Sequence, residues 1–230
     1  MIELRGIPVF EGTIKGKLLF LPHEEIIVRK KIVQDPVQEL EKYLKAKELA
    51  ISELQQLYDK ALKKMDSDVA EIFLIHQMFI LDDDFEDSVR NIILKEHFNS
   101  DFAVVRTTRT FAKAFCRVDS EYIKGRSADL KDIAKRLIRH IQDKPGNCAE
   151  LKEKVIICAE ELVPSEIVEL DVSKILALCT RKGSALSHSA IITRALNIPA
   201  VAGLGKQFAD NLNGCCAVVN GSAGTVSIET

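Results

Sequence analysis

The sequence lacks tryptophan, C-x-x-C pairs and long apolar runs, and these absences exclude several classes of protein. No apolar run approaches the roughly 20 residues that cross a bilayer, and the opening residues MIELRGIPVFEG lack the apolar core of a signal peptide. The six dispersed cysteines have no finger-like spacing, which argues against a structural zinc site. We therefore expect free thiols and a cytoplasmic protein without a membrane segment.

An excess of charge of either sign is also missing. The 32 Lys and Arg side chains nearly balance the 34 Asp and Glu side chains, which leaves a net charge of -2. No net field then attracts nucleic acid or an anionic membrane. The apolar fraction of 47% excludes an intrinsically disordered chain, and 230 residues suffice for one large domain or two small ones.

Glycine and proline are absent from residues 37–124, whereas six of the eleven glycines lie between Gly183 and Gly224. Over residues 36–65, apolar side chains recur every three or four positions, which predicts a long helix capped by Asp35. Similar patterns predict helices over residues 67–80, 85–97, 101–119 and 121–142, so that residues 22–144 form a helical bundle. The apolar face predicted for the first helix comprises Val37, Leu40, Leu44, Ile51, Leu54, Tyr58, Ala61 and Met65.

The rest of the chain has the pattern of an α/β domain. An N-terminal hairpin over residues 4–21 has too little apolar surface to stand alone, so we expect it to pack with the second half of the chain. The α/β domain then comprises residues 1–21 and 145–230, and the bundle is an insertion. Short apolar runs predict buried strands over residues 155–159, 175–180, 200–202, 216–220 and 225–228, with a short helix from Pro164 to about Leu170.

Residues 181–205 carry the strongest functional pattern. A strand ends near Thr180, a turn follows at Gly183, and a helix begins at Ser187 or His188. Free amides at such a helix start favour an anion, and the helix dipole disfavours a charged imidazole. A neutral, nucleophilic histidine beside anion-binding amides is what reversible phosphoryl capture requires. The alternative is a histidine that only caps or packs the helix.

An acidic run, DDDFED over residues 82–87, follows the second predicted helix. Carboxylates suit a helix N-terminus, so a solvated helix start is one interpretation. Met78 lies off the apolar face of helix 67–80 and Phe79 lies at its margin, and such side chains beside carboxylates suit a partner with an apolar and basic surface. His76 lies on the apolar face itself, so a buried histidine and a contact residue are both open interpretations.

The segment LSHSAIITRALNIPAVAG resembles the phosphohistidine signature of the phosphoenolpyruvate-utilising enzymes. Members of the enzyme I family, the phosphoenolpyruvate–protein phosphotransferases of the bacterial sugar phosphotransferase system, are similar in their N-terminal half. This wider similarity covers RGIPVFEGTIKGKLLF, EIFLIHQMFILDDDFED, EYIKGRSADLKDIAKRLIRHI and ELVPSEIVEL. The resemblance implies an α/β phosphohistidine (swivelling) domain formed from both chain ends, with an inserted antiparallel α-helical bundle.

The same resemblance implies that His188 carries the phosphoryl group and exchanges it with a histidine of the small carrier protein HPr. Gly183, Ser187 and Ser189 are then placed to position the phosphoryl oxygens, because phosphoryl transfer depends mainly on in-line positioning and charge stabilisation. The bundle is implied to bind HPr through His76, Met78, Phe79, Asp82, Asp84 and Arg126.

In the enzyme I family, a further C-terminal barrel domain binds phosphoenolpyruvate and Mg²⁺ and forms the homodimer. This chain ends at Thr230, before that domain begins. The resemblance therefore implies no cofactor in this stretch, a monomer, and exchange with HPr without a reaction with phosphoenolpyruvate. The C-terminal domain is implied as a second partner in the full enzyme.

Two departures from the family pattern bear on transfer. The loop that usually reads GGRTSH has Ala185 and Leu186 in place of Arg and Thr, and Ile167 replaces a Thr that can hydrogen-bond the active histidine. Three alternatives stay open: the nitrogen-regulatory paralogue of enzyme I, a relative of pyruvate phosphate dikinase, and a module that binds HPr without transfer. The inserted bundle argues against the dikinase.

Overall fold

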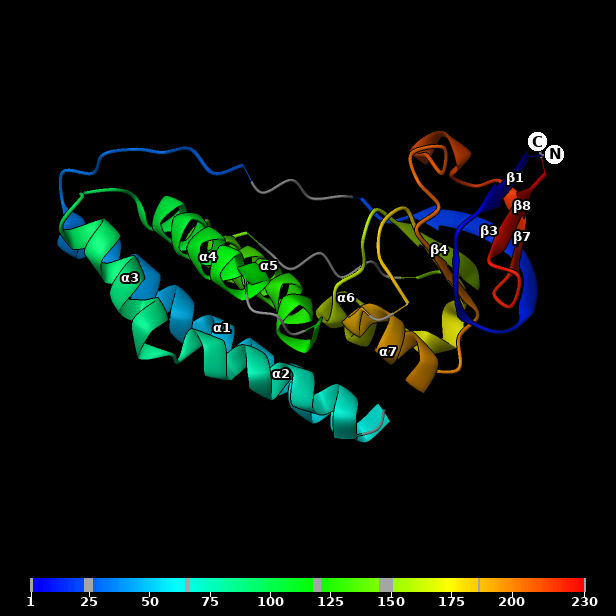
Figure 1. The fold of residues 1–230 in the computed structure, drawn as a ribbon, viewed down its shortest axis with the longest axis horizontal. Helices are drawn as coiled ribbons and strands as arrows, with labels where there is room; N and C mark the ends of the chain where they lie inside the picture. Colours follow the sequence, from blue (N-terminus) through cyan, green and yellow to red (C-terminus); the bar gives the residue numbers. More distant parts are fainter. Residues whose placement is uncertain are drawn as a thin grey trace. The chain divides into compact units, whose positions relative to one another are not determined.

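The computed structural model describes residues 2–22, 27–64, 67–117, 121–144, 151–185 and 187–229. The chain divides into two compact units, and Figure 1 labels most of their helices and strands. One unit, called the α/β unit here, comprises Met1–Glu24, Ala61–Val69 and Cys148–Thr230; the other, the helical unit, comprises Glu25–Lys60 and Ala70–Asn147. The division predicted from the sequence, 1–21 with 145–230 against 22–144, differs from this one chiefly at Ala61–Val69 and stays a prediction.

The bundle helices are α1 (Pro36–Lys64), α2 (Ser67–Ile80), α3 (Asp83–Leu94), α4 (Ser100–Arg117) and α5 (Glu121–Ile141). They form where the apolar periodicity predicts them. Asp35 caps α1 as predicted, because its Oδ1 accepts hydrogen bonds from the backbone amides of Val37 and Gln38, each at 3.0 Å. Asp82 caps α3 by accepting a hydrogen bond from Phe85 N at 2.9 Å, so the acidic run does begin a helix.

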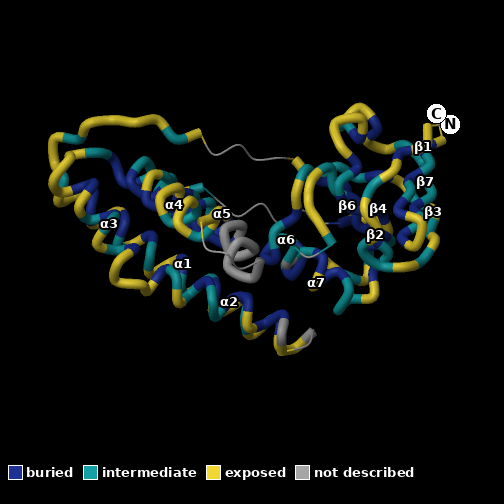
Figure 2. Tube along the Cα trace, viewed as in Figure 1, coloured by how far each residue is buried: buried dark blue, intermediate teal, exposed yellow. Residues whose placement is uncertain are grey.

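The predicted buried face of α1 is partly wrong. Leu40, Leu54 and Ala61 are buried as expected, but Val37 is 61% exposed. The prediction also included residues spaced seven apart from Val37, and those that the structure describes lie beside the row formed by Leu40, Leu54 and Ala61, on the side that is less buried. The buried side is completed by Tyr43, Ala46, Ala50 and Leu57. In Figure 2, buried and exposed segments alternate along the bundle helices, as expected for helices with one buried face.

The α/β unit contains an 8-stranded mixed sheet in the order β1-β8-β7-β3-β4-β5-β6-β2. Its strands are β1 (Ile2–Arg5), β2 (Ile7–Phe10), β3 (Thr13–Phe20), β4 (Val155–Ala159), β5 (Ile175–Thr180), β6 (Ala200–Ala202), β7 (Cys216–Asn220) and β8 (Thr225–Ile228). Each neighbouring pair from β3 through β6 is parallel, and the remaining pairs are antiparallel. Helix α6 (Pro164–Glu169) lies in the crossover from β4 to β5, and α7 (His188–Ala195) lies in the crossover from β5 to β6.

The N-terminal strands pack with the second half of the chain, as expected, but the predicted hairpin is wrong. Strand β1 pairs with β8, β2 pairs with β6, and β3 lies between β7 and β4. Strands β1 and β2 therefore end the sheet order on opposite sides, although Gly6 alone separates them in sequence. The sheet must curve until its two edges meet at Gly6. A Cβ added at Gly6 would lie 2.3 Å from Ala202 O, so only glycine fits this closure.

The core of the α/β unit is apolar and includes two thiols. Cys158 of β4 and Cys179 of β5 occupy the same register position on neighbouring strands, and both side chains are buried. The cysteines within the described residues are free, as expected, while Cys148 lies outside those residues. Among the described helices, none is long and apolar enough to cross a membrane.

Candidate functional site

The helix that carries the predicted nucleophile begins beyond the carboxyl end of a parallel strand. Strand β5 ends at Thr180, and α7 begins at His188 after a short loop, so the predicted strand–turn–helix order is confirmed. Ser187 is the N-cap residue: its Oγ accepts a hydrogen bond from Ala190 N at 3.3 Å. The side chain of His188 and the whole of Leu186 lie outside the described residues. The helix start therefore lies at the edge where α/β sheets commonly bind their ligands.

Two of the hydroxyls predicted to position a phosphoryl group lie close together. Ser187 Oγ is 3.0 Å from Ser189 Oγ, and it also donates a hydrogen bond to Ser184 O at 3.0 Å. Because the Ser187 hydrogen is used toward Ser184, Ser189 is the donor in the hydroxyl pair. The Ser189 hydroxyl can turn from Ser187 to an incoming anion at the cost of one hydrogen bond.

The loop before α7 is shaped by Gly183, the third residue in the predicted positioning set. Its φ of 114° is in the left-handed region that favours glycine. Thr180 Oγ1 donates a hydrogen bond to Lys182 O at 2.6 Å and so holds the start of the turn. Gly183, Ser187 and Ser189 line one small hollow of the α/β unit, together with residues of β2, β5 and β6. The three predicted positioning residues are thus brought together.

Arg194 of α7 is a feature of this region that the sequence did not indicate. Its Nη2 donates a hydrogen bond to Ala185 O at 2.6 Å, and its Nε donates to Val9 O in β2 at 3.1 Å. No local pattern predicts this, because the two acceptors lie 9 and 185 residues away in sequence. Arg194 joins the loop before His188 to strand β2.

Ile167, at one of the departures from the family pattern, is fully buried in α6. It is not among the residues that line the hollow beside α7. An apolar side chain at this position is satisfied by packing, and it offers no hydroxyl to a histidine. No described contact at this position therefore replaces the missing hydroxyl.

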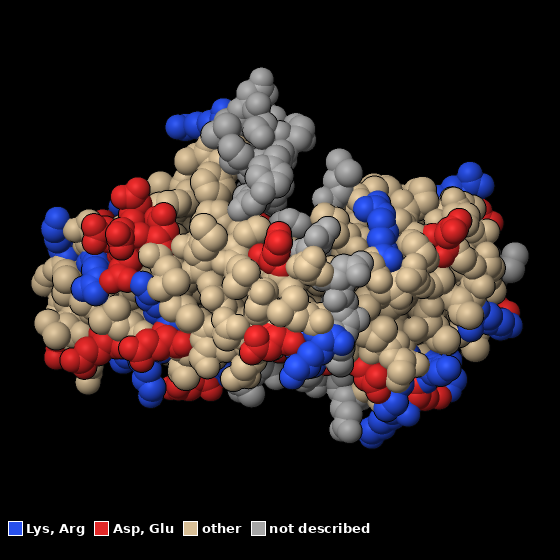
Figure 3. Space-filling view, turned by 90° about the horizontal axis from the view of Figure 1, so that it is seen from below, with Lys and Arg blue, Asp and Glu red and all other residues tan. Residues whose placement is uncertain are grey.

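The residues predicted to bind a partner differ in accessibility. Met78 is 71% exposed, and Asp82 and Asp84 are exposed at the junction of α2 and α3. Phe79 is half-buried, and its ring centroid lies 5.7 Å from that of Phe115 in α4. The side chain of Arg126 lies outside the described residues. In Figure 3, acidic side chains gather over part of the helical unit.

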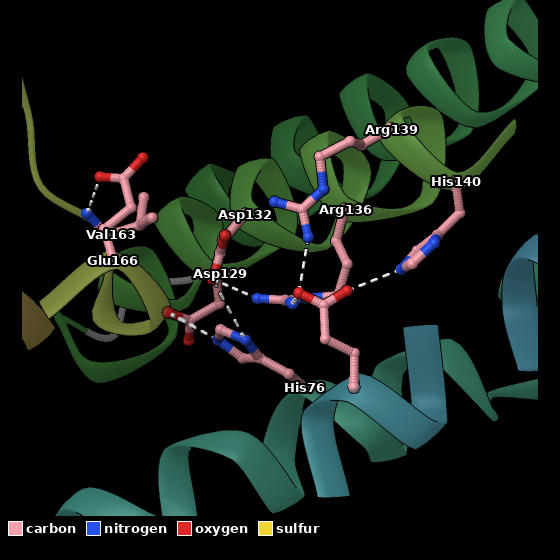
Figure 4. A network of polar contacts seen from close by, with 9 residues as sticks. His76, Asp129, Asp132, Arg136, Arg139, His140, Val163 and Glu166 are labelled. Atoms are coloured by element: carbon pink, nitrogen blue, oxygen red, sulfur yellow. Dashed lines mark hydrogen bonds and ion pairs between the residues drawn. The ribbon is translucent and has the colours of Figure 1, made fainter. Parts of the chain in front are cut away.

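His76 is fully buried, so its placement among the partner contacts is corrected: the interpretation as an interior histidine holds. Its Nε2 lies 3.5 Å from Asp129 Oδ1 and its Nδ1 lies 3.6 Å from Asp132 Oδ2, and both aspartates are buried in α5. Figure 4 shows the ring pointing from α2 toward α5 between these carboxylates. Two buried carboxylates explain why a histidine occupies the apolar face of α2.

Glu53 of α1 is the centre of the same polar cluster. It accepts hydrogen bonds from Arg136, from Arg139 at 2.5 Å and from the His140 ring at 2.6 Å (Figure 4). Burial alone would raise the pKa of the Glu53 carboxyl, but the His140 hydrogen bond and the two arginine charges outweigh burial and lower that pKa to about 2. Within the described ranges, no group of three or more His, Cys, Asp or Glu side chains is arranged to hold a metal ion.

The fold and the position of His188 define a phosphohistidine-type α/β domain with a helical insertion. Two family models match the chain: "PEP-utilising enzyme, N-terminal" matches residues 5–126, and "PEP-utilising enzyme, mobile domain" matches residues 151–224. The chain therefore belongs to the PEP-utilising enzymes.

Within this family, the similarity is to the N-terminal part of enzyme I. The phosphoenolpyruvate-protein phosphotransferase of Bacillus subtilis (strain 168) is 33% identical over 230 residues, which are 100% of this chain and 40% of that protein. The protein of the same name from Priestia megaterium is 32% identical over 228 residues, 99% of this chain and 40% of that protein. The chain thus spans 40% of the length of these curated relatives.

Solved structures agree with this assignment. The solution NMR structure of an enzyme I protein (nEIt) is 30% identical, has a TM-score of 0.80, and is matched over 98% of this chain and 92% of that one. The N-terminal domain of enzyme 1-nitrogen is 24% identical with a TM-score of 0.64, covers 98% of this chain and 93% of that one, and shows a shared fold. The predicted resemblance and fold class are confirmed.

Proposed function

We propose that this chain carries a phosphoryl group on His188 and exchanges it reversibly with a histidine of HPr. The observation that supports this proposal is the position of His188 as the first residue of the Ser187-capped helix α7, within the part matched by the mobile-domain model. In the transfer, the bond from phosphorus to the HPr nitrogen breaks as the bond to a His188 nitrogen forms. Amides and hydroxyls at the start of α7 stabilise the charge on the phosphoryl oxygens.

The proposed docking surface for HPr consists of Met78, Asp82 and Asp84, with half-buried Phe79 at its edge. Met78 supplies an exposed apolar contact, and the two carboxylates supply charge complementary to a basic partner. Arg126 stays a candidate contact from the sequence alone. The His76 ring has no exposed surface, so it is not part of this docking surface. Its role in the proposal is to hold α2 against α5 through Asp129 and Asp132.

The wider activity is also part of the proposal. The curated relatives are named phosphoenolpyruvate-protein phosphotransferases, and this chain matches 40% of their length. We propose the same enzyme class for the protein to which this chain belongs. The predicted C-terminal phosphoenolpyruvate-binding domain, its Mg²⁺ and the homodimer come from the resemblance. The cytoplasmic location and the domain limits at residues 22 and 144 are predictions from the residue pattern of the chain.

The direct test is incubation of the purified chain with HPr phosphorylated on its histidine. We expect acid-labile phosphate on the chain, and a mass shift confined to the peptide that contains His188. His188→Ala should abolish labelling. His97→Asn is the matched control, because His97 is exposed between α3 and α4 with a φ of 58° that asparagine tolerates. Labelling that persists in His188→Ala would refute the proposal.

A binding module without transfer is the second candidate. Ala185, in place of the family's arginine, and the buried Ile167 favour it, because both remove a polar group from the neighbourhood of the active histidine. Calorimetric titration with unphosphorylated HPr separates the two candidates. Binding together with an unlabelled His188 peptide would support the module, and binding together with labelling supports the transferase.

A further inference from the structure

We propose that Arg194 is a positioning residue for the transfer step, acting by fixing the main chain of the loop that leads into His188. This inference rests on the proposed function of His188. Arg194 does not need to touch the phosphoryl group, because its two hydrogen bonds end on backbone carbonyls. It sets where the first turn of α7 lies relative to the rest of the sheet.

The two hydrogen bonds from Arg194 to Ala185 O and Val9 O, called the clamp here, require an arginine. Nη2 donates to Ala185 O at 2.6 Å while Nε donates to Val9 O at 3.1 Å. One planar guanidinium thus joins the loop to β2, which itself pairs with β6. A lysine carries the same charge but has a single donor group, so it cannot reproduce two donors at a fixed separation.

The clamp acts at a point of the loop that is held by few other described contacts. Lys182 O accepts from Thr180 Oγ1, and Ser184 O accepts from Ser187 N and Ser187 Oγ, so these carbonyls are fixed by the loop itself. Ala185 O is held instead by a charged donor from the body of α7. Hydrogen bonds from a charged donor are about twice as strong as neutral ones, so Arg194 is the firmest link at this position.

This arrangement also bears on the departure at residue 185. The family has an arginine side chain where this chain has Ala185, and the loss of that side chain removes a polar group from the loop. Arg194 donates its hydrogen bond to the backbone carbonyl of residue 185, so this contact does not involve the side chain at that position. The main-chain path into His188 is therefore held whatever side chain occupies position 185.

The consequence is an effect on rate without an effect on partner affinity. In-line displacement is sensitive to misplacements of about 1 Å, which can cost on the order of 100-fold in rate. The proposed HPr surface lies on α2 and α3, whereas Arg194 lies on α7. Loosening the loop should slow phosphoryl transfer and leave the dissociation constant for HPr unchanged.

The test compares Arg194→Lys and Arg194→Ala with wild type in single-turnover transfer from saturating phosphorylated HPr. We expect the rate to fall about 10- to 100-fold in both variants, with HPr affinity unchanged. Added guanidinium ion should restore part of the rate to Arg194→Ala, which a variant that is merely destabilised would not show. Lys174→Ala is the matched control, because Lys174 Nζ also holds a backbone carbonyl, that of Leu151 at 2.7 Å, but at the amino end of β5.

Hydrogen exchange of the loop amides gives a second measurement that does not depend on transfer. The amides of residues 183–185 and 187 should exchange faster in Arg194→Lys than in wild type, while those of β4 stay protected. Wild-type rates in both variants, or unchanged loop exchange, would overturn the inference even if Arg194→Ala folds poorly. A wild-type chain that transfers nothing overturns the proposed function instead, and faster loop exchange would then still establish the clamp.

Discussion

The two units of the chain differ in what they bury. The helical unit holds charged side chains in its interior, with Asp129, Asp132 and Arg136 each no more than 4% exposed. The core cluster of the α/β unit, within the described residues, consists of apolar side chains and the thiols of Cys158 and Cys179. One unit is thus fixed by paired charges between helices, and the other by an apolar core inside a curved sheet.

This difference follows from their local structure. Amphipathic helices present similar apolar faces to one another, and one buried polar cluster can fix which faces meet. A curved sheet is already fixed by its register and its closure at Gly6, so its core can be wholly apolar. The unit proposed to hold HPr and the unit that carries His188 should therefore respond to different perturbations.

The largest effect is expected from Arg136→Met in the helical unit. Arg136 pairs with Glu53 and lies 3.9 Å from Asp132 Oδ2, and its side chain is 2% exposed. Removing its charge takes one cationic partner from the buried Asp132 and from Glu53, which should lower the free energy of unfolding of this unit by about 3–5 kcal/mol. Hydrogen exchange of α1 and α5 measures it. Arg106→Met, which breaks an exposed pair with Glu96, is the control and should cost less than about 1 kcal/mol.

A smaller loss, confined to the α/β unit, is expected from Gly6→Ala. The added Cβ would lie 2.3 Å from Ala202 O, so the closure must open or shift, at about 2–3 kcal/mol. Gly214→Ala is the matched control: it has a φ of 83° but nothing within 4 Å of the added Cβ, so it should cost about 1 kcal/mol. Equal losses for the two variants in urea unfolding would mean that the sheet does not depend on closure at Gly6.

Features set by local pattern could be predicted from the sequence. The helix at His188, the cap at Asp35 and the strands of the second half follow from periodicity, capping residues and short apolar runs. Within the site, the positioning roles of Gly183, Ser187 and Ser189 are implied by the family resemblance, and these residues lie close to His188 in sequence.

Features set by distant pairing could not be predicted in this way. Glu53 meets Arg136 and His140 across more than 80 residues, and Arg194 meets Val9 across 185. Either partner alone looks like an ordinary surface charge. The sequence around Gly6 likewise predicts a simple turn, because nothing nearby in sequence shows that β1 and β2 pair at opposite ends of the sheet order.

The stability of the two units should depend on pH in different ranges: the helical unit should weaken in acid and the α/β unit in alkali. Glu53 has a pKa lowered from 4.5 to about 2, so its stabilisation is present above pH 4.5 and is lost as the pH falls toward 2. Because the Glu53 side chain is only 20% exposed, we expect the helical unit to lose about 2–3 kcal/mol over that range. Hydrogen exchange of α1 at pH 6 and pH 3 measures this, and Glu53→Gln should flatten the slope.

The α/β unit should respond at the other end of the pH scale. Burial raises the pKa of the Cys179 thiol from 9.0 to about 12, and burial raises that of Cys158 also. The folded state favours the protonated thiols, so folding costs nothing extra below pH 9. Above pH 9 the unfolded chain can release these protons more easily, and the free energy of unfolding of the region around β4 and β5 should fall by about 1 kcal/mol per thiol by pH 10. A helical unit that weakens first in alkali, or an α/β unit that weakens first in acid, would contradict the comparison.

The smallest effects separate the units by function instead of stability. Ser187→Ala removes the cap of α7 and Asp82→Ala removes the cap of α3, and each should cost about 1 kcal/mol. The two losses should look alike in thermal unfolding but not in phosphoryl exchange.

Ser187→Ala should slow transfer to His188 at unchanged HPr affinity, because it alters the start of α7. Asp82→Ala should weaken HPr binding at unchanged saturated rate, because the lost carboxylate belongs to the proposed docking surface. If both variants changed the same kinetic constant, the division of binding and transfer between the two units would be wrong.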